Sequence, residues 1–285
     1  MSDHRLAVIG AGTMGTGLAT LAVGHGLPVV LVDHDAGTRD RAEGVVRQNL
    51  RMAQMLGKLP AEAGGPDLLV LAPDPEAAAD ADMVVECVVE RADVKAQVLA
   101  EVSAAVAPGT PLLTNTSAIP VDELADAAVR PEDVVGAHFM NPPHLIEGVE
   151  VVRGPRTSKE ALDRAHTWLT DLGRAPVVVG DGPGFVINRV LQRMINEAAT
   201  VVQEGLATPE AVDALFTSCL GHRTGPLATG DLIGLDNVVD TLHVLHERTG
   251  SDGYRPCRLL LEKVEQGQLG RKTGAGFHEY GTGIA

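Results

Sequence analysis

A histidine and a glutamate twelve residues apart have the types and spacing for acid–base chemistry. His138 lies near the end of the apolar run 134–139, and Glu150 begins the next run. We predict that both runs are strands joined by a short Asn141-Pro-Pro loop, which can bring the imidazole and the carboxylate within hydrogen-bonding distance. A carboxylate behind a histidine fixes its tautomer and raises its basicity, which suits proton transfer from an alcohol. A histidine near a strand end is more often structural, so this interpretation depends on its surroundings.

A glycine-rich turn near the N-terminus has the pattern of a phosphate site. It follows the apolar run 6–10, opens a helical pattern over 16–24, and precedes a second run that ends in Asp33. GxGxxG alone is weak evidence, but this order of strand, turn, helix and acidic strand end is the full dinucleotide-binding context. Gly10 would permit the tight turn and Gly12 the approach of the pyrophosphate. The whole site would comprise Gly10, Gly12, Thr13, Met14 and Gly15, with the helix N-terminus donating hydrogen bonds.

Asp33 determines which dinucleotide we expect. A carboxylate at the end of the second strand can accept hydrogen bonds from the adenosine ribose diol, and it would repel a 2′-phosphate. His34 and Asp35 follow, so no arginine stands beside Asp33 to pair with such a phosphate. The sequence therefore favours NAD over NADP. FAD binds a similar loop in larger chains, and hydride transfer to NAD suits the histidine better.

Eight short apolar runs must position these residues. They alternate with alanine-rich helical stretches, and several of them are near-continuously apolar, as in parallel strands buried on both faces. The alternation predicts an α/β fold with a Rossmann-type doubly wound sheet over residues 1–181. The charged segment 38–54 indicates a helix that makes an excursion away from the sheet before Lys58. The expected strands are 6–10, 29–33, 68–71, 83–89, 112–115, 134–139, 149–152 and 177–180.

The breaker cluster 180–184 marks a change of pattern. Beyond it, apolar residues recur with helical period, and Gly205 suits a helix C-terminus. One helix face would comprise Ile187, Leu191, Met194, Ala198 and Val201, and further helices are expected over 209–220, 236–249 and 255–266. We predict an all-helical domain over 182–285 that binds substrate. We also expect it to form a homodimer, because about a hundred residues offer little core of their own.

Composition excludes several classes of protein. The formal net charge is −15, so the chain lacks the positive charge that nucleic acid requires. No run of about 18 apolar residues exists, which excludes a membrane-spanning helix, and the first strand begins too early for a signal peptide. Cys87, Cys219 and Cys257 lack CxxC spacing and indicate reduced thiols. We therefore expect a cytoplasmic protein.

No metal site is expected from the histidines. His243 and His246 could share a helix face, but neither an HExxH arrangement nor a converging cysteine accompanies them. Asp122, Glu123 and Glu101 fit solvated helix faces better than acid–base pairs.

Further motifs occur in a fixed order along almost the whole chain. In the first domain they are Gly10-Ala-Gly-Thr-Met-Gly15, Val89-Glu-Arg91, Asn115-Thr-Ser117, Gly136-Ala-His-Phe-Met-Asn-Pro142 and Val149-Glu-Val-Val152. In the second they are Pro183-Gly-Phe-Val-Ile-Asn-Arg189, Gly225-Pro226, Gly234-Leu-Asp236, Tyr254-Arg-Pro256 and Leu269-Gly-Arg-Lys-Thr-Gly274. With these motifs the chain resembles the 3-hydroxyacyl-CoA dehydrogenase family, and it is close in length to bacterial 3-hydroxybutyryl-CoA dehydrogenases.

The resemblance implies roles for the matching residues. His138 would be the general base that takes the 3-hydroxyl proton as a hydride leaves C3 for NAD, and Glu150 would orient it. Ser117 and Asn188 would hydrogen-bond the substrate. The cofactor contacts would come from Glu90, Lys95, Ser117, Asn141 and Lys272. Ser117 and Glu90 also follow strand ends, where open α/β sheets bind ligands, whereas Lys272 could equally be a solvated tail residue.

Three segments depart from the family pattern, and one of them is Gly221-His-Arg-Thr224, where relatives often have a proline. Relatives usually carry Pro-Val-Met-Lys-Leu before the glutamate, whereas this chain has Pro143-His-Leu-Ile-Glu-Gly148. Lys58 would contact the substrate, since the family uses this excursion to bind the CoA nucleotide, but bacterial relatives often have several lysines there. The partner is therefore an acyl thioester of CoA or of an acyl carrier protein, for instance a glyceryl unit in polyketide or other natural-product biosynthesis. Relatives that act on carnitine or sugar acids are a further alternative.

A different class of function is an NAD-binding protein that has lost catalysis. Such a protein should show damage at the acid–base residues. His138, Glu150, Ser117 and Asn188 are all present, which favours an active enzyme.

Overall fold

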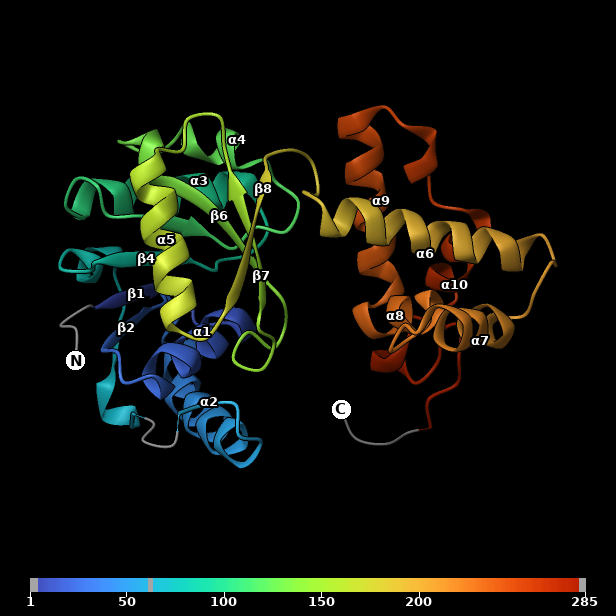
Figure 1. The fold of residues 1–285 in the computed structure, drawn as a ribbon, viewed down its shortest axis with the longest axis horizontal. Helices are drawn as coiled ribbons and strands as arrows, with labels where there is room; N and C mark the ends of the chain where they lie inside the picture. The colour runs from blue at the N-terminus through green and yellow to red at the C-terminus, as the bar shows by residue number, and fades with distance from the viewer. Residues whose placement is uncertain (1–4, 61–63, 282–285) are drawn as a thin grey trace. The chain divides into compact units, whose positions relative to one another are not determined.

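A computed structural model describes residues 5–60 and 64–281 and divides the chain into two compact units, Met1–Gly182 and Pro183–Ala285 (Figure 1). The residues before Arg5, which bear on the signal-peptide expectation, lie outside the described part. Each unit has its own hydrophobic core, so each is described by itself below.

The first unit is built on one eight-stranded sheet in the order β3-β2-β1-β4-β5-β6-β7-β8. Neighbouring strands are parallel except at the β6–β7 pair, which is antiparallel. The order reverses between β1 and β4, which is the switch point where doubly wound sheets bind ligands. The strands are β1 (Leu6–Ile9), β2 (Val29–Val32), β3 (Leu69–Ala72), β4 (Met83–Glu86), β5 (Leu112–Thr114), β6 (Val134–Phe139), β7 (Gly148–Arg153) and β8 (Ala175–Gly180). The predicted Rossmann-type sheet is confirmed.

Alternation along the strands builds the core. Successive side chains of a strand point to opposite faces of the sheet, and residues such as Leu6 and Val8 of β1 join the cluster formed with α1 and α5. Ala7 and Ile9, on the other face, are equally buried, as expected for a sheet covered on both sides. The helices of this unit are α1 (Thr13–Gly24), α2 (Ala36–Met55), α3 (Ala92–Ala105), α4 (Val121–Ala125) and α5 (Lys159–Asp171).

Helix α2 begins earlier than predicted and stays with the core. The Asp35 side chain accepts a hydrogen bond from the backbone N–H of Thr38 at 2.7 Å, which caps the helix and fixes its start. Ala42, Val46 and Leu50 are buried in the same cluster as α1, and Figure 1 shows the two helices together. The expected excursion therefore packs through one face against α1.

Strands β8 and β4 differ most from the prediction. β8 begins at Ala175, two residues before the predicted start, and it is an edge strand with one neighbour, in which Val177 is 62% exposed and Val178 is 45% exposed. β4 ends at Glu86, three residues before the predicted end. Residues 87–89 instead turn towards α3, and Val89 is exposed.

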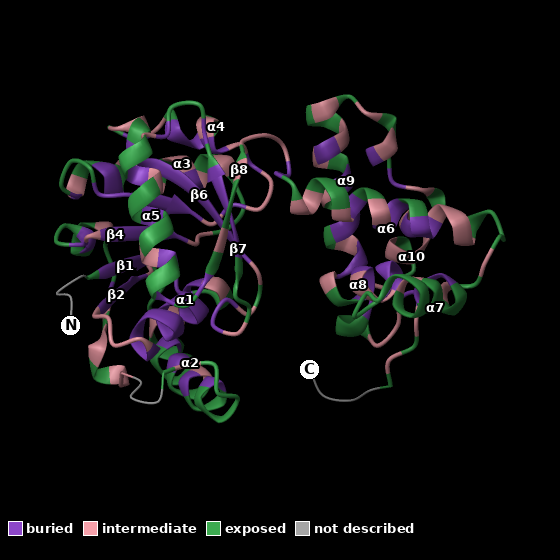
Figure 2. Ribbon diagram, viewed as in Figure 1, coloured by how far each residue is buried: buried purple, intermediate pink, exposed green. Residues whose placement is uncertain are grey.

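The second unit packs five helices around a separate core, whose buried residues are visible in Figure 2. The helices are α6 (Ile187–Gln203), α7 (Pro209–Leu220), α8 (Pro226–Ile233), α9 (Leu235–Thr249) and α10 (Arg258–Glu265). The predicted helical region is confirmed, but α8 was missed, because eight residues that include Pro226 and Gly230 show no clear period. Within residues 5–60 and 64–281, no helix combines the length and apolar character that crossing a bilayer requires.

The buried face of α6 is rotated from the predicted one. Its fully buried residues include Gln192, Ile195 and Asn196, whereas Leu191 and Met194 are half-buried. Asn196 tolerates burial because its amide donates to Arg255 O and accepts from Cys257 N, both at 2.9 Å. A search for apolar residues alone could not find this face.

Candidate active site

The antiparallel β6–β7 pair places His138 directly opposite Glu150. Directly opposite residues of an antiparallel pair share a face, and here they touch, with His138 Nδ1 at 2.9 Å from Glu150 Oε2. His138 is 7% exposed and Glu150 is 4% exposed. A carboxylate that holds Nδ1 leaves Nε2 as the nitrogen that can exchange a proton with a ligand. The predicted contact is therefore present.

Strand β5 fixes the end of β6 that carries this histidine. The side-chain oxygen of Asn115, one residue past β5, accepts a hydrogen bond at 3.0 Å from the backbone N–H of Phe139. The sequence motif contained Asn115, but its positioning role was missed, because only the sheet order reveals that β5 and β6 are neighbours. Glu150 thus fixes the imidazole of His138, and Asn115 fixes the backbone that follows it.

The glycine-rich loop has the close contacts that its sequence predicts. Gly10 has a φ of +100°, and a Cβ on it would lie 2.8 Å from Cys87 O; a Cβ on Gly15 would lie 1.8 Å from Gly10 O. A Cβ on Gly12 would meet nothing within 4 Å, so the loop is open on that side. Helix α1 starts at Thr13 and no side chain caps it, so its first amides can donate to a phosphate. These residues fit NAD.

Asp33 follows β2 and also braces the glycine loop. Its Oδ2 accepts the Ala11 N–H at 2.8 Å, and its Oδ1 accepts the Asp35 N–H at 3.0 Å. A carboxylate oxygen can accept two hydrogen bonds, so both oxygens keep capacity for a ribose diol. The side chain of His34 is 98% exposed beside it.

Glu90, which follows β4, is the acceptor on which the loop after β5 converges. Its Oε1 accepts from Thr116 Oγ1 at 2.7 Å, from Ser117 N at 2.8 Å and from Ser117 Oγ at 3.1 Å. Burial would raise the pKa of Glu90, but the charge of Lys95 and these hydrogen bonds outweigh it and lower the pKa. The structure therefore places an ionised Glu90 in contact with Ser117 at the carboxyl edge of the sheet, and these hydrogen bonds order the loop.

Lys95, in α3, contacts Glu90 from the protein interior and is only 1% exposed. Its Nζ donates to Glu86 Oε1 at 2.8 Å and lies 3.3 Å from Glu90 Oε2. Burial would lower the pKa of Lys95, but the charges of Glu86 and Glu90 raise it. Glu86 also accepts from Thr114 Oγ1 at 2.7 Å. Lys95 thus positions both glutamates, while its direct contact with the cofactor stays a prediction.

A pocket of about 480 Å³ lies beside the glycine loop. The loop after β6 contributes Asn141, Pro142 and His144, and the rest of the wall comes from Ala11, Gly12, Thr13, Thr16, Thr38, Arg41, Ala42, Val45, Asn49 and Met52. The structure therefore brings the predicted residues Gly12, Thr13 and Asn141 to one cavity. Sequence analysis did not identify the α2 residues of its wall.

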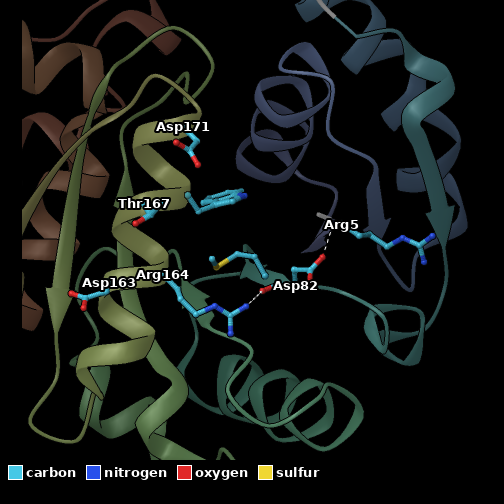
Figure 3. A pocket seen from close by; sticks show the side chains of 8 residues that line it. Arg5, Asp82, Asp163, Arg164, Thr167 and Asp171 are labelled. Atoms are coloured by element: carbon cyan, nitrogen blue, oxygen red, sulfur yellow. Dashed lines mark hydrogen bonds between the residues drawn. The ribbon is translucent and has the colours of Figure 1, made fainter. Parts of the chain in front are cut away.

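A second pocket of about 270 Å³ lies elsewhere on the first unit (Figure 3). Arg5 and Asp82, which precede β1 and β4, line it together with residues of α5 such as Arg164. The Arg5 N–H donates to Asp82 Oδ2, and Arg164 donates to Asp82 O. It therefore lies at the amino ends of the parallel strands, away from the edge where such sheets bind ligands, and it contains none of the predicted residues.

The remaining predicted residues have partners of their own. Lys58 Nζ donates to Glu147 Oε1 at 3.1 Å. In the second unit, Lys272 Nζ lies 2.6 Å from both carboxylate oxygens of Asp236, and this ion pair joins two of the family motifs. Asn188 lies in the first turn of α6. His246 Nδ1 bonds to Ser251 O at 3.0 Å. No cluster of three metal-binding side chains occurs among the described residues.

This sheet, its glycine loop and the buried His138–Glu150 pair are the features of an NAD-binding oxidoreductase. Family comparison gives the same result over both units: the NAD-binding domain of 3-hydroxyacyl-CoA dehydrogenase matches residues 5–182, and its C-terminal domain matches residues 184–280. The chain belongs to the 3-hydroxyacyl-CoA dehydrogenase family.

Individual relatives match along the whole chain. A probable 3-hydroxybutyryl-CoA dehydrogenase of Deinococcus radiodurans is 40% identical, covering 97% of this chain and 100% of the relative. The 3-hydroxybutyryl-CoA dehydrogenase of Bradyrhizobium diazoefficiens is 38% identical, covering 97% and 95%. The crystal structure of (S)-3-hydroxybutyryl-CoA dehydrogenase from Ralstonia eutropha superposes with a TM-score of 0.92 at 34% identity, covering 99% and 100%.

The buried lysine gives a stability prediction. Lys95→Met should lower the free energy of unfolding by about 3–5 kcal/mol, because it leaves Glu86 buried without its counter-charge. Urea unfolding followed through the fluorescence of Trp168, the one tryptophan of the chain, would measure the loss in the first unit. The double variant Glu86→Gln/Lys95→Met should recover part of it.

Lys159→Met is the matched control, because the Lys159 side chain is 76% exposed and its ion pair with Asp163 should contribute less than about 1 kcal/mol. A Lys95→Met protein as stable as the control would contradict the proposed positioning role.

Proposed function

We propose that this enzyme interconverts 3-hydroxyacyl and 3-oxoacyl thioesters, with His138 as the acid–base residue. The observation that carries the proposal is the 2.9 Å contact between His138 and Glu150 in a chain of this family. It gives the imidazole a fixed orientation and a negative partner, as a base acting on an alcohol requires. An inactive NAD-binding protein would have no need of this buried pair.

The reaction follows from the groups present. His138 Nε2 takes the proton of the 3-hydroxyl, and Glu150 stabilises the imidazolium that results. Bound NAD supplies the acceptor for the hydride that leaves C3. In the reverse direction His138 returns the proton to the 3-oxo oxygen. The proposed substrate contacts of Ser117 and Asn188 would hold the reacting oxygen at the histidine.

The cofactor site combines the elements described above. We assign the pyrophosphate to Gly10, Gly12, Thr13, Met14 and Gly15, and the adenosine ribose to Asp33. Glu90 and Ser117 lie where the dinucleotide would cross from β1 to β4 and β5. Asn141 and Lys272 are further proposed contacts, and Lys95 would act mainly through Glu90.

For the thioester carrier, CoA is the first candidate, since the named relatives are 3-hydroxybutyryl-CoA dehydrogenases. One observation favours an acyl carrier protein as the second candidate. Lys58, the lysine expected to contact the CoA nucleotide, is paired with Glu147, which weakens its attraction for a phosphate. We further propose that the first unit binds NAD and that the second unit binds substrate. The described cysteines are free, in line with a cytoplasmic location.

His138→Gln should lower turnover by at least about 100-fold, because a positioned general base contributes about that factor. NAD affinity should hardly change, since the ring faces C3 of the substrate. Glu150→Gln should also be slow, because the tautomer of His138 is then less well fixed. Absorbance at 340 nm with NAD and a racemic 3-hydroxybutyryl thioester measures both rates. His166→Gln, on an exposed position of α5, is the control, and turnover in His138→Gln close to that of the control would refute the mechanism.

Replacing Asp33 should change the cofactor preference. Asp33→Ser removes the charged acceptor of the ribose diol, so kcat/KM with NAD should fall by about 10-fold or more, while NADP gains little. Asp33→Ser/His34→Arg adds a charge-assisted contact for the 2′-phosphate and should prefer NADP. The control His34→Arg keeps Asp33 and should keep its preference for NAD. A wild-type enzyme that already prefers NADP would show that our assignment of Asp33 is wrong.

We propose that the second unit mediates a homodimer. Its helices expose large apolar side chains, among them Val190, Leu215, Leu220 and Leu232, each at least 59% exposed. Such surface is typical of protein interfaces. Light scattering should give twice the 29.7 kDa of one chain. Leu220→Glu/Leu232→Glu should shift the mass towards one chain, whereas Val129→Glu, in the first unit, should not. A wild-type monomer at micromolar concentration would contradict the proposal.

A further inference from the structure

The short helix α4 begins without a cap of its own. Pro120 occupies the N-cap position, and its side chain makes no capping hydrogen bond. The first N–H groups of a helix have no partner within the helix, and a proline ring offers no acceptor for them. The start of α4 therefore needs an acceptor from another part of the chain.

Asp181, which directly follows β8, supplies this acceptor from 60 and 59 residues further along the chain. Its Oδ1 accepts from Val121 N at 2.9 Å, and its Oδ2 accepts from Asp122 N at 2.8 Å. Oδ1 also accepts at 2.8 Å from the N–H of Gly182, the last residue of the first unit. Figure 1 shows α4 beside the end of β8. Hydrogen bonds from backbone N–H groups to a carboxylate are among the stronger ones, so Asp181 ties the two elements together.

The residues that Asp181 holds continue the loop that carries Ser117. Before Pro120 this loop is held at Ser117, whose N–H donates to Glu90 Oε1 at 2.8 Å. Pro120 has no N–H of its own. Val121 is therefore the first residue after Pro120 whose backbone N–H can fix the loop, and Asp181 accepts that hydrogen bond.

Val121 also packs on the strand that carries His138. A Cβ on Gly136 of β6 would lie 2.7 Å from Val121 Cγ2, so the missing side chain at Gly136 lets α4 approach the strand this closely. Val121 is 1% exposed, and His138 lies two residues beyond Gly136 in β6. The start of α4 thus joins the Ser117 loop to the strand of the proposed base.

We propose that Asp181 is a positioning residue for the reaction, which holds Ser117 in place relative to His138 through the start of α4. This inference rests on the proposed function, in which Ser117 hydrogen-bonds the substrate. Asp181 itself would touch neither the substrate nor NAD. Its loss should release the end of the Ser117 loop and leave the His138–Glu150 pair unchanged.

The test is a double-mutant cycle between Asp181 and Ser117. Ser117→Ala should lower kcat/KM for a 3-hydroxybutyryl thioester by about 10-fold, the scale of one hydrogen bond. Asp181→Ala should lower it by about 5-fold, the factor by which losing a cap shifts a helix start towards its released form. The double variant should lie within about twofold of Ser117→Ala, because releasing the loop has no further effect once the hydroxyl is gone. Independent losses would multiply to about 50-fold.

Two further variants separate positioning from a general loss of structure. Asp181→Asn keeps one oxygen as an acceptor and should recover part of the loss seen in Asp181→Ala. Arg156→Met is the matched control, because Arg156 donates to Asp122 Oδ1 and Asp122 O from the exposed side of α4. The control removes that tie and keeps the hydrogen bonds of Asp181, so kcat/KM should change less than about twofold.

Hydrogen exchange of residues 115–125, followed by mass spectrometry, gives a readout independent of turnover. This segment should exchange faster in Asp181→Ala than in wild type or Arg156→Met. If wild type oxidises no thioester, the proposed function fails, and faster exchange confined to the Asp181 variants still supports the hold on the Ser117 loop. Three results would overturn the proposal. They are unchanged exchange in Asp181→Ala, an equal loss of kcat/KM in Arg156→Met, and losses that multiply in the double variant.

Discussion

The reversal of strand direction between β6 and β7 is the constraint on which the site depends. In a purely parallel sheet the next strand would start at the opposite edge, after a long crossover. The short connection after His138 instead returns the chain antiparallel, so Glu150 faces His138 across the pair. The same connection carries Asn141 and His144 to the wall of the pocket. One topological choice thus provides the proposed base, its carboxylate partner and part of the pocket wall.

A second layer of charge supports this arrangement from the neighbouring strands. Glu86 and Glu90 follow one another around the end of β4, and the buried Lys95 holds both. Glu90 in turn orders the loop with Ser117, while Asn115 ties the same loop to Phe139. Catalysis by fixed groups requires such pre-organisation, and here it comes from hydrogen bonds between the ends of β4, β5 and β6.

Local patterns predicted much of this from the sequence. The glycine loop, the strand positions and the His138–Glu150 contact each depend on residues near one another in the chain, so spacing was sufficient. The ion pair of Lys95, the burial of Asn196 and His144, and the exposure of β8 depend on which elements become neighbours. A polar residue such as Asn196 is buried because its partners are 59 and 61 residues away, and no local period contains that information.

In the proposed mechanism, Glu150 holds the Nδ1 proton of His138 and leaves Nε2 as the base. Nitrogen-15 NMR of histidine-labelled enzyme tests it most directly, with the signals of His138 assigned by their loss in His138→Gln. At a pH where the ring is neutral, the account predicts a protonated Nδ1 and a bare Nε2, with the proton more evenly shared between the two nitrogens in Glu150→Gln. A wild-type ring that carries its proton on Nε2 would contradict the account.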